Sequence, residues 1–237
     1  MAFLREPSDR EPILRAPLVV VGLIALIVAA HLVRVLAPAN ISDAMLTHLA
    51  FMPARYLAWP EDVVDVAIAA LPFVGYIFVH ANWTHLIVNC LWLLAFGSPV
   101  ARRFHALPFL GLFLLSGIAA ALAHLAGNWG SQDAAIGASG AIAGIMGAGI
   151  RVVSVADSLG RLEGGPLQSL KSRQVLIFSL VWVLANTVTG LTGLGALPGL
   201  ELVAWQAHIG GYLAGLLLAG PMDRWFVNQE SDAGIAA

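Results

Sequence analysis

Six apolar stretches recur along the 237-residue chain, and more polar segments separate them. A helix needs about 20 apolar residues to cross the roughly 30 Å hydrocarbon core of a bilayer. Each stretch has about this length, so we expect each to form a membrane-spanning helix. The expected spans cover residues 17–37, 77–99, 106–126, 136–155, 174–191 and 202–220. The pattern therefore predicts an all-α membrane protein built as a six-transmembrane-helix bundle.

The segment between the first two spans, residues 38–76, is too long for a simple turn. It mixes apolar stretches with acidic residues, so it is a poor spanning helix. We expect one or two short helices lying in the membrane interface, with Trp59 as an anchor. The other outer loops, 127–135 and 192–201, are short and rich in glycine. The prediction is thus a bundle with a long interfacial first outer loop.

Positive charges predict the orientation, because Lys and Arg collect on the cytoplasmic side of membrane proteins. Ten of the twelve basic residues lie on one side of the predicted topology, and only Arg34 and Arg55 lie on the other. Both termini are therefore expected in the cytoplasm. The chain then divides into an N-terminal cytoplasmic tail (1–16), a six-helix membrane domain (17–220) and a C-terminal cytoplasmic tail (221–237).

Composition supports a membrane protein and excludes several other classes. Apolar residues make up 59% of the chain and charged residues 11%, whereas soluble domains have about 25% charged residues. The net charge of −2 leaves no basic surface for nucleic acid. The single cysteine, Cys90, excludes an internal disulfide and a four-cysteine zinc site.

Polar side chains inside the predicted spans are candidates for chemistry, because they are costly in hydrocarbon. His80, His85 and Asn89 lie near the start of the second span. His85 and Asn89 are four residues apart and share a helix face, and His80 is expected about one and a half turns earlier. Such residues can simply hydrogen-bond neighbouring helices. A cluster this dense favours a functional site.

The fourth and sixth spans each contain one further candidate. Ser139 is expected within one turn of the outer end of its helix, where backbone N–H groups lack partners and could hold an oxyanion. Glycines around it, such as Gly140, are typical of closely packed membrane helices. His208 lies in the sixth span and is followed by glycines that allow a neighbouring helix to come close.

These candidates are predicted at one depth, because the second, fourth and sixth spans run in the same direction. A serine hydroxyl becomes a nucleophile when a neutral histidine takes its proton. The fourth and sixth spans contain no Asp or Glu, so we expect a Ser139–His208 dyad rather than a Ser-His-Asp triad. His85, Asn89 and the Ser139 backbone N–H are expected to donate to the oxyanion.

Two other uses of these residues have less support. A zinc site would show H-E-x-x-H or a nearby carboxylate, and neither is present in the spans. A transporter would show paired broken helices in two halves of the chain, and the sequence has no such pattern. We therefore expect no metal and no cofactor.

Three motifs together resemble the rhomboid family of intramembrane serine proteases, over about residues 71–220. They are G-x-S-G, H-x-x-x-x-H-x-x-x-N and A-H-x-x-G-x-x-x-G, carried here by Gly137, Ser139, Gly140, His80, His85, Asn89, Ala207, His208, Gly211 and Gly215. The family pattern differs at one position. An aromatic residue often follows the serine by four positions and stacks on the catalytic histidine, whereas this chain has Ala143.

The resemblance implies a rhomboid-like six-helix bundle with Ser139 as nucleophile and His208 as general base. His85 and Asn89 would contribute to the oxyanion site, with His80 in a supporting role. The resemblance also implies cleavage of single-span membrane proteins in or beside their spans, within the lipid bilayer and without a cofactor. The fifth span would move to admit substrate, and Gly211 and Gly215 would bring the sixth span against the fourth.

An inactive relative that binds membrane-protein clients is the alternative to an active protease. Such relatives generally lack the serine or the histidine, and both are present here. We also expect a water-accessible cavity that is roofed by residues 38–76. The small size and the absence of an organelle presequence favour the plasma membrane of a bacterium. The oligomeric state is not predicted.

Overall fold

The computed structural model describes residues 16–58, 62–153, 166–194 and 204–227, and within these ranges the chain is helical apart from turns and one isolated β-bridge. The all-α prediction is therefore confirmed. Six long helices form a bundle: α1 (Leu18–Leu36), α5 (Trp83–Phe104), α6 (Ala106–Gly127), α7 (Ser139–Val153), α8 (Arg173–Thr192) and α9 (Trp205–Met222).

Four of these helices, α1, α5, α6 and α8, are long and apolar enough to cross a membrane, counting only the part of the chain that is described. The helices at the predicted fourth and sixth spans, α7 and α9, begin later than predicted, at Ser139 and Trp205. α7 has 15 residues and is buried along almost its whole length. Neighbouring helices thus separate α7 from lipid. α7 can therefore be shorter and less apolar than a helix that faces lipid.

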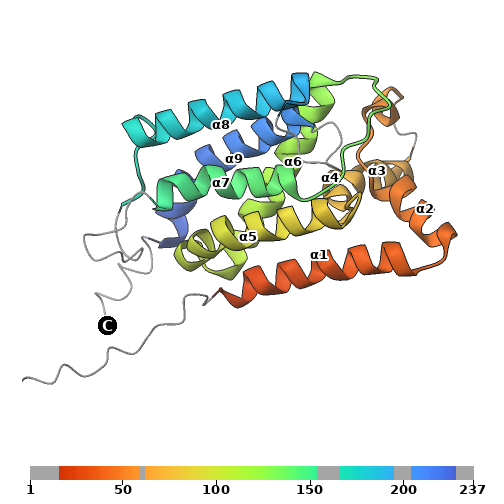
Figure 1. Ribbon diagram of the computed structural model, residues 1–237, viewed down its shortest axis with the longest axis horizontal. Helices are drawn as coiled ribbons and strands as arrows, with labels where there is room; N and C mark the ends of the chain where they lie inside the picture. Colours follow the sequence, from red (N-terminus) through yellow and green to blue (C-terminus); the bar gives the residue numbers. More distant parts are fainter. Residues whose placement is uncertain (1–15, 59–61, 154–165, 195–203, 228–237) are drawn as a thin grey trace, which may run out of the picture.

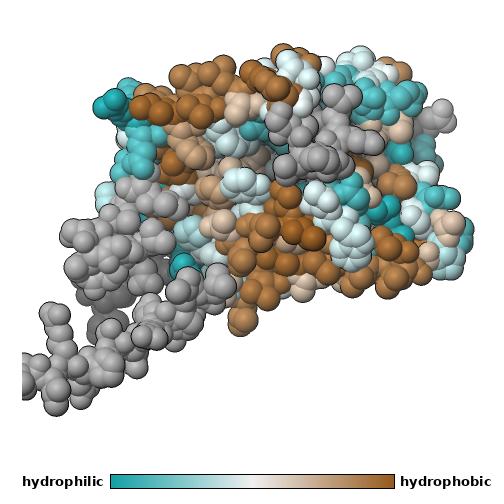
Figure 2. All heavy atoms as spheres, viewed as in Figure 1, coloured by the Kyte–Doolittle hydropathy of each residue, from teal (hydrophilic) through white to brown (hydrophobic). Residues whose placement is uncertain are grey.

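The helices are arranged around α7, which contacts α5, α6 and α9 (Figure 1). α8 packs against α9 at one side of the bundle, and α1 packs against α5 at the opposite side (Figure 1). α1 begins at the end of the bundle where α9 ends (Figure 1). The two outer helices, α1 and α8, carry hydrophobic surface (Figure 2). This arrangement has lipid-facing helices outside and small-residue helices inside.

Small residues let α7 and α9 approach closely. A Cβ atom added to Gly211 would collide with the carbonyl oxygen of Gly140, and one added to Gly215 would collide with that of Gly144. Close backbone approach of this kind is typical of membrane helices with small-xxx-small patterns. Gly211 and Gly215 therefore face α7, at the serine motif and about one turn beyond it.

Short helices lie between α1 and α5, but they are more numerous than the one or two that the sequence predicted. They are α2 (Ala39–Leu49), a 3₁₀ turn (Pro53–Tyr56), α3 (Val63–Ala70), α4 (Pro72–Gly75) and a second 3₁₀ turn (Tyr76–Phe78). Trp59, the expected anchor, lies outside the described residues. So do most of the two predicted tails and residues 154–155 of the predicted fourth span.

Phe51 fastens this segment to the chain just before α7. Its backbone N–H donates to the carbonyl of Ala135 at 3.0 Å, and the Ala135 N–H donates back at 2.8 Å. The buried Phe51 ring packs against the rings of Tyr56, Phe73 and Tyr76. The segment between α1 and α5, here called the first outer segment after its predicted location, therefore lies beside the turn that leads into Ser139.

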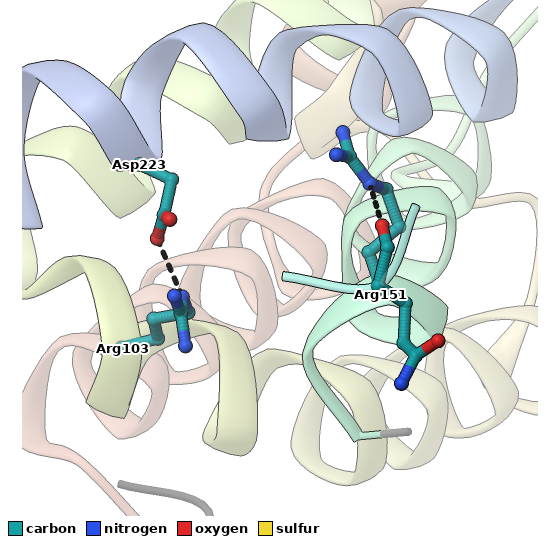
Figure 3. A network of polar contacts seen from close by, with 4 residues as sticks. Arg103, Arg151 and Asp223 are labelled. Carbon is teal, nitrogen blue, oxygen red and sulfur yellow. Dashed lines mark hydrogen bonds and ion pairs between the residues drawn. The ribbon is translucent and has the colours of Figure 1, made fainter. Parts of the chain in front are cut away.

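α5, α7 and α9 finish, and α8 begins, at the end of the bundle opposite the start of α7 (Figure 1). Basic residues lie at or next to these helix ends, here called the basic end: Arg102, Arg103, Arg151, Lys171, Arg173 and Arg224. Arg103 Nε lies 2.6 Å from Asp223 Oδ1, which links the ends of α5 and α9 (Figure 3). Arg151 Nε donates to the Gln168 carbonyl at 3.0 Å (Figure 3), and its Nη1 donates to the Leu216 carbonyl at 2.9 Å. These contacts connect α7 to α9 as well. α9 itself continues beyond the predicted boundary at 220, to Met222.

Candidate active site

Ser139 is the first residue of α7, and the turn before it requires glycine. Gly137 has φ +102°, a conformation that L-residues rarely adopt. A Cβ atom at Gly137 would lie 2.6 Å from Cε1 and Nε2 of His85. The Gly137 N–H donates to the Tyr76 carbonyl at 2.9 Å. The turn is thus held in place while the His85 ring lies directly against it.

The start of α7 offers backbone donors beside the serine. The first N–H groups of a helix have no acceptor within that helix. The N–H of Ala138 donates to Nε2 of His80 at 3.3 Å. The N–H of Ser139 belongs to the same first turn and is therefore suited to bind an oxyanion. Gly140, the next residue, packs against Ala120 and the Tyr76 hydroxyl with no room for a side chain.

The second predicted span begins later than the sequence indicated, and this corrects the position of His80. α5 begins at Trp83, because the Asn82 side chain accepts the His85 N–H at 2.9 Å and acts as an N-cap. His80 therefore precedes the helix instead of lying on it. The predicted span boundary at 77 was wrong because it followed hydropathy and ignored the capping residue.

His80 is fully buried between the serine turn and His85. Its Nε2 accepts from Ala138, so a neutral His80 carries its proton on Nδ1. The His80 and His85 rings meet edge to face, with centroids 5.1 Å apart. His80 thus supports the turn before Ser139 and one side of the His85 ring.

His85 and Asn89 face the same turn from α5. The Asn89 side chain donates to the His85 carbonyl at 3.1 Å. Its Nδ2 atom lies 3.6 Å from the position that a Cβ atom of Gly137 would occupy. Both predicted oxyanion residues therefore lie next to the backbone that precedes Ser139.

His208 reaches Ser139 from α9. Its Nε2 atom lies 2.7 Å from the Ser139 Oγ atom, within hydrogen-bond distance. A neutral imidazole that accepts the hydroxyl proton at Nε2 has the geometry of a general base beside its nucleophile. The contact depends on the close approach of Gly211 to Gly140 one turn away.

Sequence reasoning missed one residue of this site, Asn186 on α8. Its Oδ1 atom lies 2.9 Å from Nδ1 of His208, the ring nitrogen that faces away from Ser139. The available signal was an amide side chain inside a predicted membrane span. No motif marks Asn186, and its position on the helix does not by itself show which neighbour it faces.

The structure brings all the predicted site residues together. They lie just before or on α5, in the serine turn and at the start of α7, and on α9: His80, His85, Asn89, Gly137, Ser139, Gly140, His208, Gly211 and Gly215. Within the described ranges, no group of three or more His, Cys, Asp or Glu side chains has the geometry to hold a metal ion. The arrangement places a serine hydroxyl next to a histidine ring nitrogen and to the backbone N–H groups at the start of α7, which is chemically suited to nucleophilic catalysis.

Comparison with known proteins shows the family of the chain. A family model described as the Rhomboid domain matches residues 69–224. The chain belongs to the rhomboid family. The matched part of this rhomboid includes the serine turn, α5–α9 and Asn186, whereas α1 and α2 precede it.

Curated relatives resemble this rhomboid at low identity. RHOMBOID-like protein 4 of Arabidopsis thaliana is 29% identical over 162 residues, which cover 66% of this chain and 36% of the relative. Rhomboid protease AarA of Providencia stuartii is 27% identical over 156 residues, which cover 60% of this chain and 52% of the relative. The matches therefore span between about a third and about half of the relatives' own lengths.

Proposed function

We propose that this rhomboid is an intramembrane serine endopeptidase that hydrolyses peptide bonds in or next to the transmembrane segments of membrane proteins. Ser139 is the nucleophile and His208 the general base. The observation that supports this most is the 2.7 Å contact between Ser139 Oγ and His208 Nε2. The relative named Rhomboid protease AarA supports the same reaction class.

In the proposed reaction, Ser139 Oγ attacks the scissile carbonyl carbon while His208 Nε2 takes the hydroxyl proton. The carbonyl oxygen becomes an oxyanion, which accepts hydrogen bonds from the Ser139 N–H and from the His85 and Asn89 side chains. His208 then gives its proton to the leaving amine. Water repeats the sequence on the acyl-enzyme and regenerates Ser139.

Hydrolysis requires that water reach Ser139 inside the bilayer. The position of the first outer segment supports a route for this water. The serine turn lies at the end of the bundle opposite the basic residues, beside the β-bridge between Phe51 and Ala135 (Figure 1). Polar side chains surround this end, among them Asn82, Thr84 and Gln206. Residues 38–76 act as a partial roof over a cavity that opens to the outside.

The proposed topology has six spans, with the basic end and both termini in the cytoplasm, in the plasma membrane of a bacterium. It follows from the gathering of arginines at the end where α5, α7 and α9 finish. The test uses a Cys90→Ala background with a cysteine in place of Thr84 or Arg102. A membrane-impermeant maleimide added outside intact cells is expected to label the first variant only. Labelling of the second variant alone would show that the protein has the opposite orientation in the membrane.

The deciding experiment for activity uses purified protein in liposomes with a model single-span substrate. We expect Ser139→Ala and His208→Ala to lower cleavage by at least about 10⁴-fold. Ser98→Ala is the matched control, because the Ser98 hydroxyl donates to the Leu94 carbonyl within α5, away from the site. Equal cleavage by all variants would exclude the Ser139–His208 dyad. Substrate binding without cleavage by the wild type would indicate a rhomboid-like protein that only binds clients.

A further inference from the structure

The contact between α8 and His208 has a defined direction. Asn186 Oδ1 lies 2.9 Å from His208 Nδ1, and Asn186 Nδ2 donates to the Trp182 carbonyl at 2.9 Å. The opposite amide orientation would point Oδ1 at the Trp182 carbonyl, so that two acceptors faced each other. The Trp182 carbonyl therefore holds Asn186 as a hydrogen-bond acceptor toward His208.

An acceptor at Nδ1 determines the tautomer of a neutral histidine. Nδ1 must carry the proton, which leaves the Nε2 lone pair facing the Ser139 hydroxyl at 2.7 Å. An asparagine that instead donates to Nδ1 stabilises the wrong tautomer and impairs serine hydrolases. The second hydrogen bond of Asn186, to its own helix, excludes that arrangement here.

We infer that Asn186 is a positioning residue, which holds His208 in the tautomer and orientation that general-base catalysis needs. The inference rests on the proposed function and extends the dyad to a Ser139–His208–Asn186 arrangement. It also accounts for Ala143, which leaves this chain without an aromatic side chain at the position that often stacks on the histidine. A hydrogen bond from α8 orients the ring instead.

Other contacts between α8 and α9 hold Asn186 within reach. Ser179 Oγ lies 2.7 Å from the Tyr212 hydroxyl oxygen. The Trp182 ring stacks on the Tyr212 ring, with centroids 4.4 Å apart and planes 18° apart. These contacts lie one to two helical turns from Asn186. They matter because α8 has a single buried residue, Val175, near its start, so the packing of its outer half depends on few side chains.

The chemistry of α8 explains why an amide is suited to this position. Apolar side chains of α8 face outward at Leu176, Leu180, Val181 and Leu184. An ionised carboxylate at position 186 would place a negative charge close to lipid, where charge is unfavourable. A neutral acceptor satisfies His208 without that penalty. Asn186 thus supplies orientation but no countercharge for the imidazolium.

The first test compares steady-state cleavage by the wild type, Asn186→Leu and Asn186→Ala, with Thr189→Val as control. Leu matches Asn in shape but cannot accept the hydrogen bond from His208. Asn186→Ala removes the same acceptor and replaces the Leu variant in the comparison if that variant does not fold. We expect kcat to fall about 10- to 100-fold with KM nearly unchanged. Thr189, whose hydroxyl donates to the Leu194 carbonyl, should tolerate Val within about twofold. Wild-type kcat in both Asn186 variants would overturn the inference.

The second test is a pH profile that a purely structural role would not change. In Asn186→Asp, a carboxylate next to His208 stabilises the imidazolium form of that ring. Protonation of His208, which removes the general base, should therefore begin at a higher pH than in the wild type. We expect the acid limb of the kcat profile to move upward by about one pH unit or more. An acid limb identical to that of the wild type would contradict direct contact between position 186 and the base.

The third test needs no cleavage and separates this inference from the proposed function. In ¹⁵N-histidine-labelled protein, with His208 assigned by comparison with His208→Ala, the nitrogen shifts report which ring atom is protonated. We expect the Nδ1–H tautomer in the wild type and its loss in Asn186→Leu. Absence of cleavage by a wild type that has the Nδ1–H tautomer would refute the proposed protease activity alone. An Nε2–H tautomer in a wild type that cleaves substrate would refute the positioning role alone.

Discussion

His208 Nε2 lies 2.7 Å from Ser139 Oγ, although the two residues are 69 positions apart in the chain. The two side chains meet because Gly211 and Gly215 allow the backbone of α9 to touch that of α7. A histidine at the right depth would not be sufficient for catalysis, since a general base must be within hydrogen-bond reach of its proton. The glycine contact between the two helices is therefore part of the proposed catalytic machinery.

Gly215→Ala tests that contact. The added methyl group collides with the Gly144 carbonyl, so α9 must move away from α7. We expect overpacking to lower the free energy of unfolding by about 1–3 kcal/mol, and serine labelling by a fluorophosphonate to slow at the same time. Gly111→Ala is the control, because nothing lies within 4 Å of its added Cβ. Equal behaviour of the two variants would show that the close approach is not needed.

Gly137→Ala tests the turn before the serine. The new Cβ atom would lie 2.6 Å from the His85 ring and the residue would keep φ +102°. We expect kcat to fall by about 10²- to 10³-fold, because displacing His85 removes an oxyanion donor. Gly193→Ala also places a side chain at positive φ, +70°, but in open space. Similar losses of activity in Gly137→Ala and Gly193→Ala would show that backbone strain, and not displacement of His85, lowers kcat.

Tyr56 makes the first outer segment sensitive to high pH. Its hydroxyl donates to the Ala69 carbonyl at 3.0 Å, and burial raises the pKa of Tyr56 to about 12 against the smaller opposing effect of Arg55. In an unfolded segment this tyrosine would ionise at about pH 10. The stabilising contribution is therefore complete below about pH 10 and is lost as the pH rises through about 12.

We expect hydrogen exchange in residues 39–76 to accelerate across that pH range in the wild type. Tyr56→Phe removes the ionisable group, so its exchange should respond less to pH over the same range. The measurement is exchange mass spectrometry on protein in detergent, with α6 peptides as an internal reference. An equal response of the two proteins would show that another group controls the segment.

The Arg103–Asp223 ion pair is expected to stabilise the basic end without affecting the reaction. Both side chains are almost buried, 7% and 11% exposed, and the two atoms lie 2.6 Å apart. Asp223→Ala should lower the free energy of unfolding by about 1–3 kcal/mol, because it leaves a desolvated guanidinium without this carboxylate. Activity of the folded fraction should remain, since Ser139 lies at the other end of the bundle. Arg102→Met, at an exposed neighbour, serves as the control in reversible unfolding measurements.

Local rules predicted most of the helices and failed at three helix starts, those of α5, α7 and α9. Apolar length identified α1, α5, α6 and α8 as spans, because lipid imposes a hydropathy requirement on each helix separately. The start of α5 depended on capping by Asn82, and hydropathy does not report a cap. α7 begins later than its predicted span because the turn from Gly137 to Ser139 is shaped by contacts with His85 and Tyr76, which come from other parts of the chain.

The sequence by itself determined the membrane class, the family resemblance and the candidates Ser139, His208, His85 and Asn89, because these depend on composition, motif and depth along a helix. Only the tertiary structure decided which atoms meet. Asn186 shows the reason: its role depends on how α8 is rotated about its axis and how far it lies from α9. Those quantities are set by packing between helices, such as the Trp182–Tyr212 stack, and no local pattern in the chain encodes them.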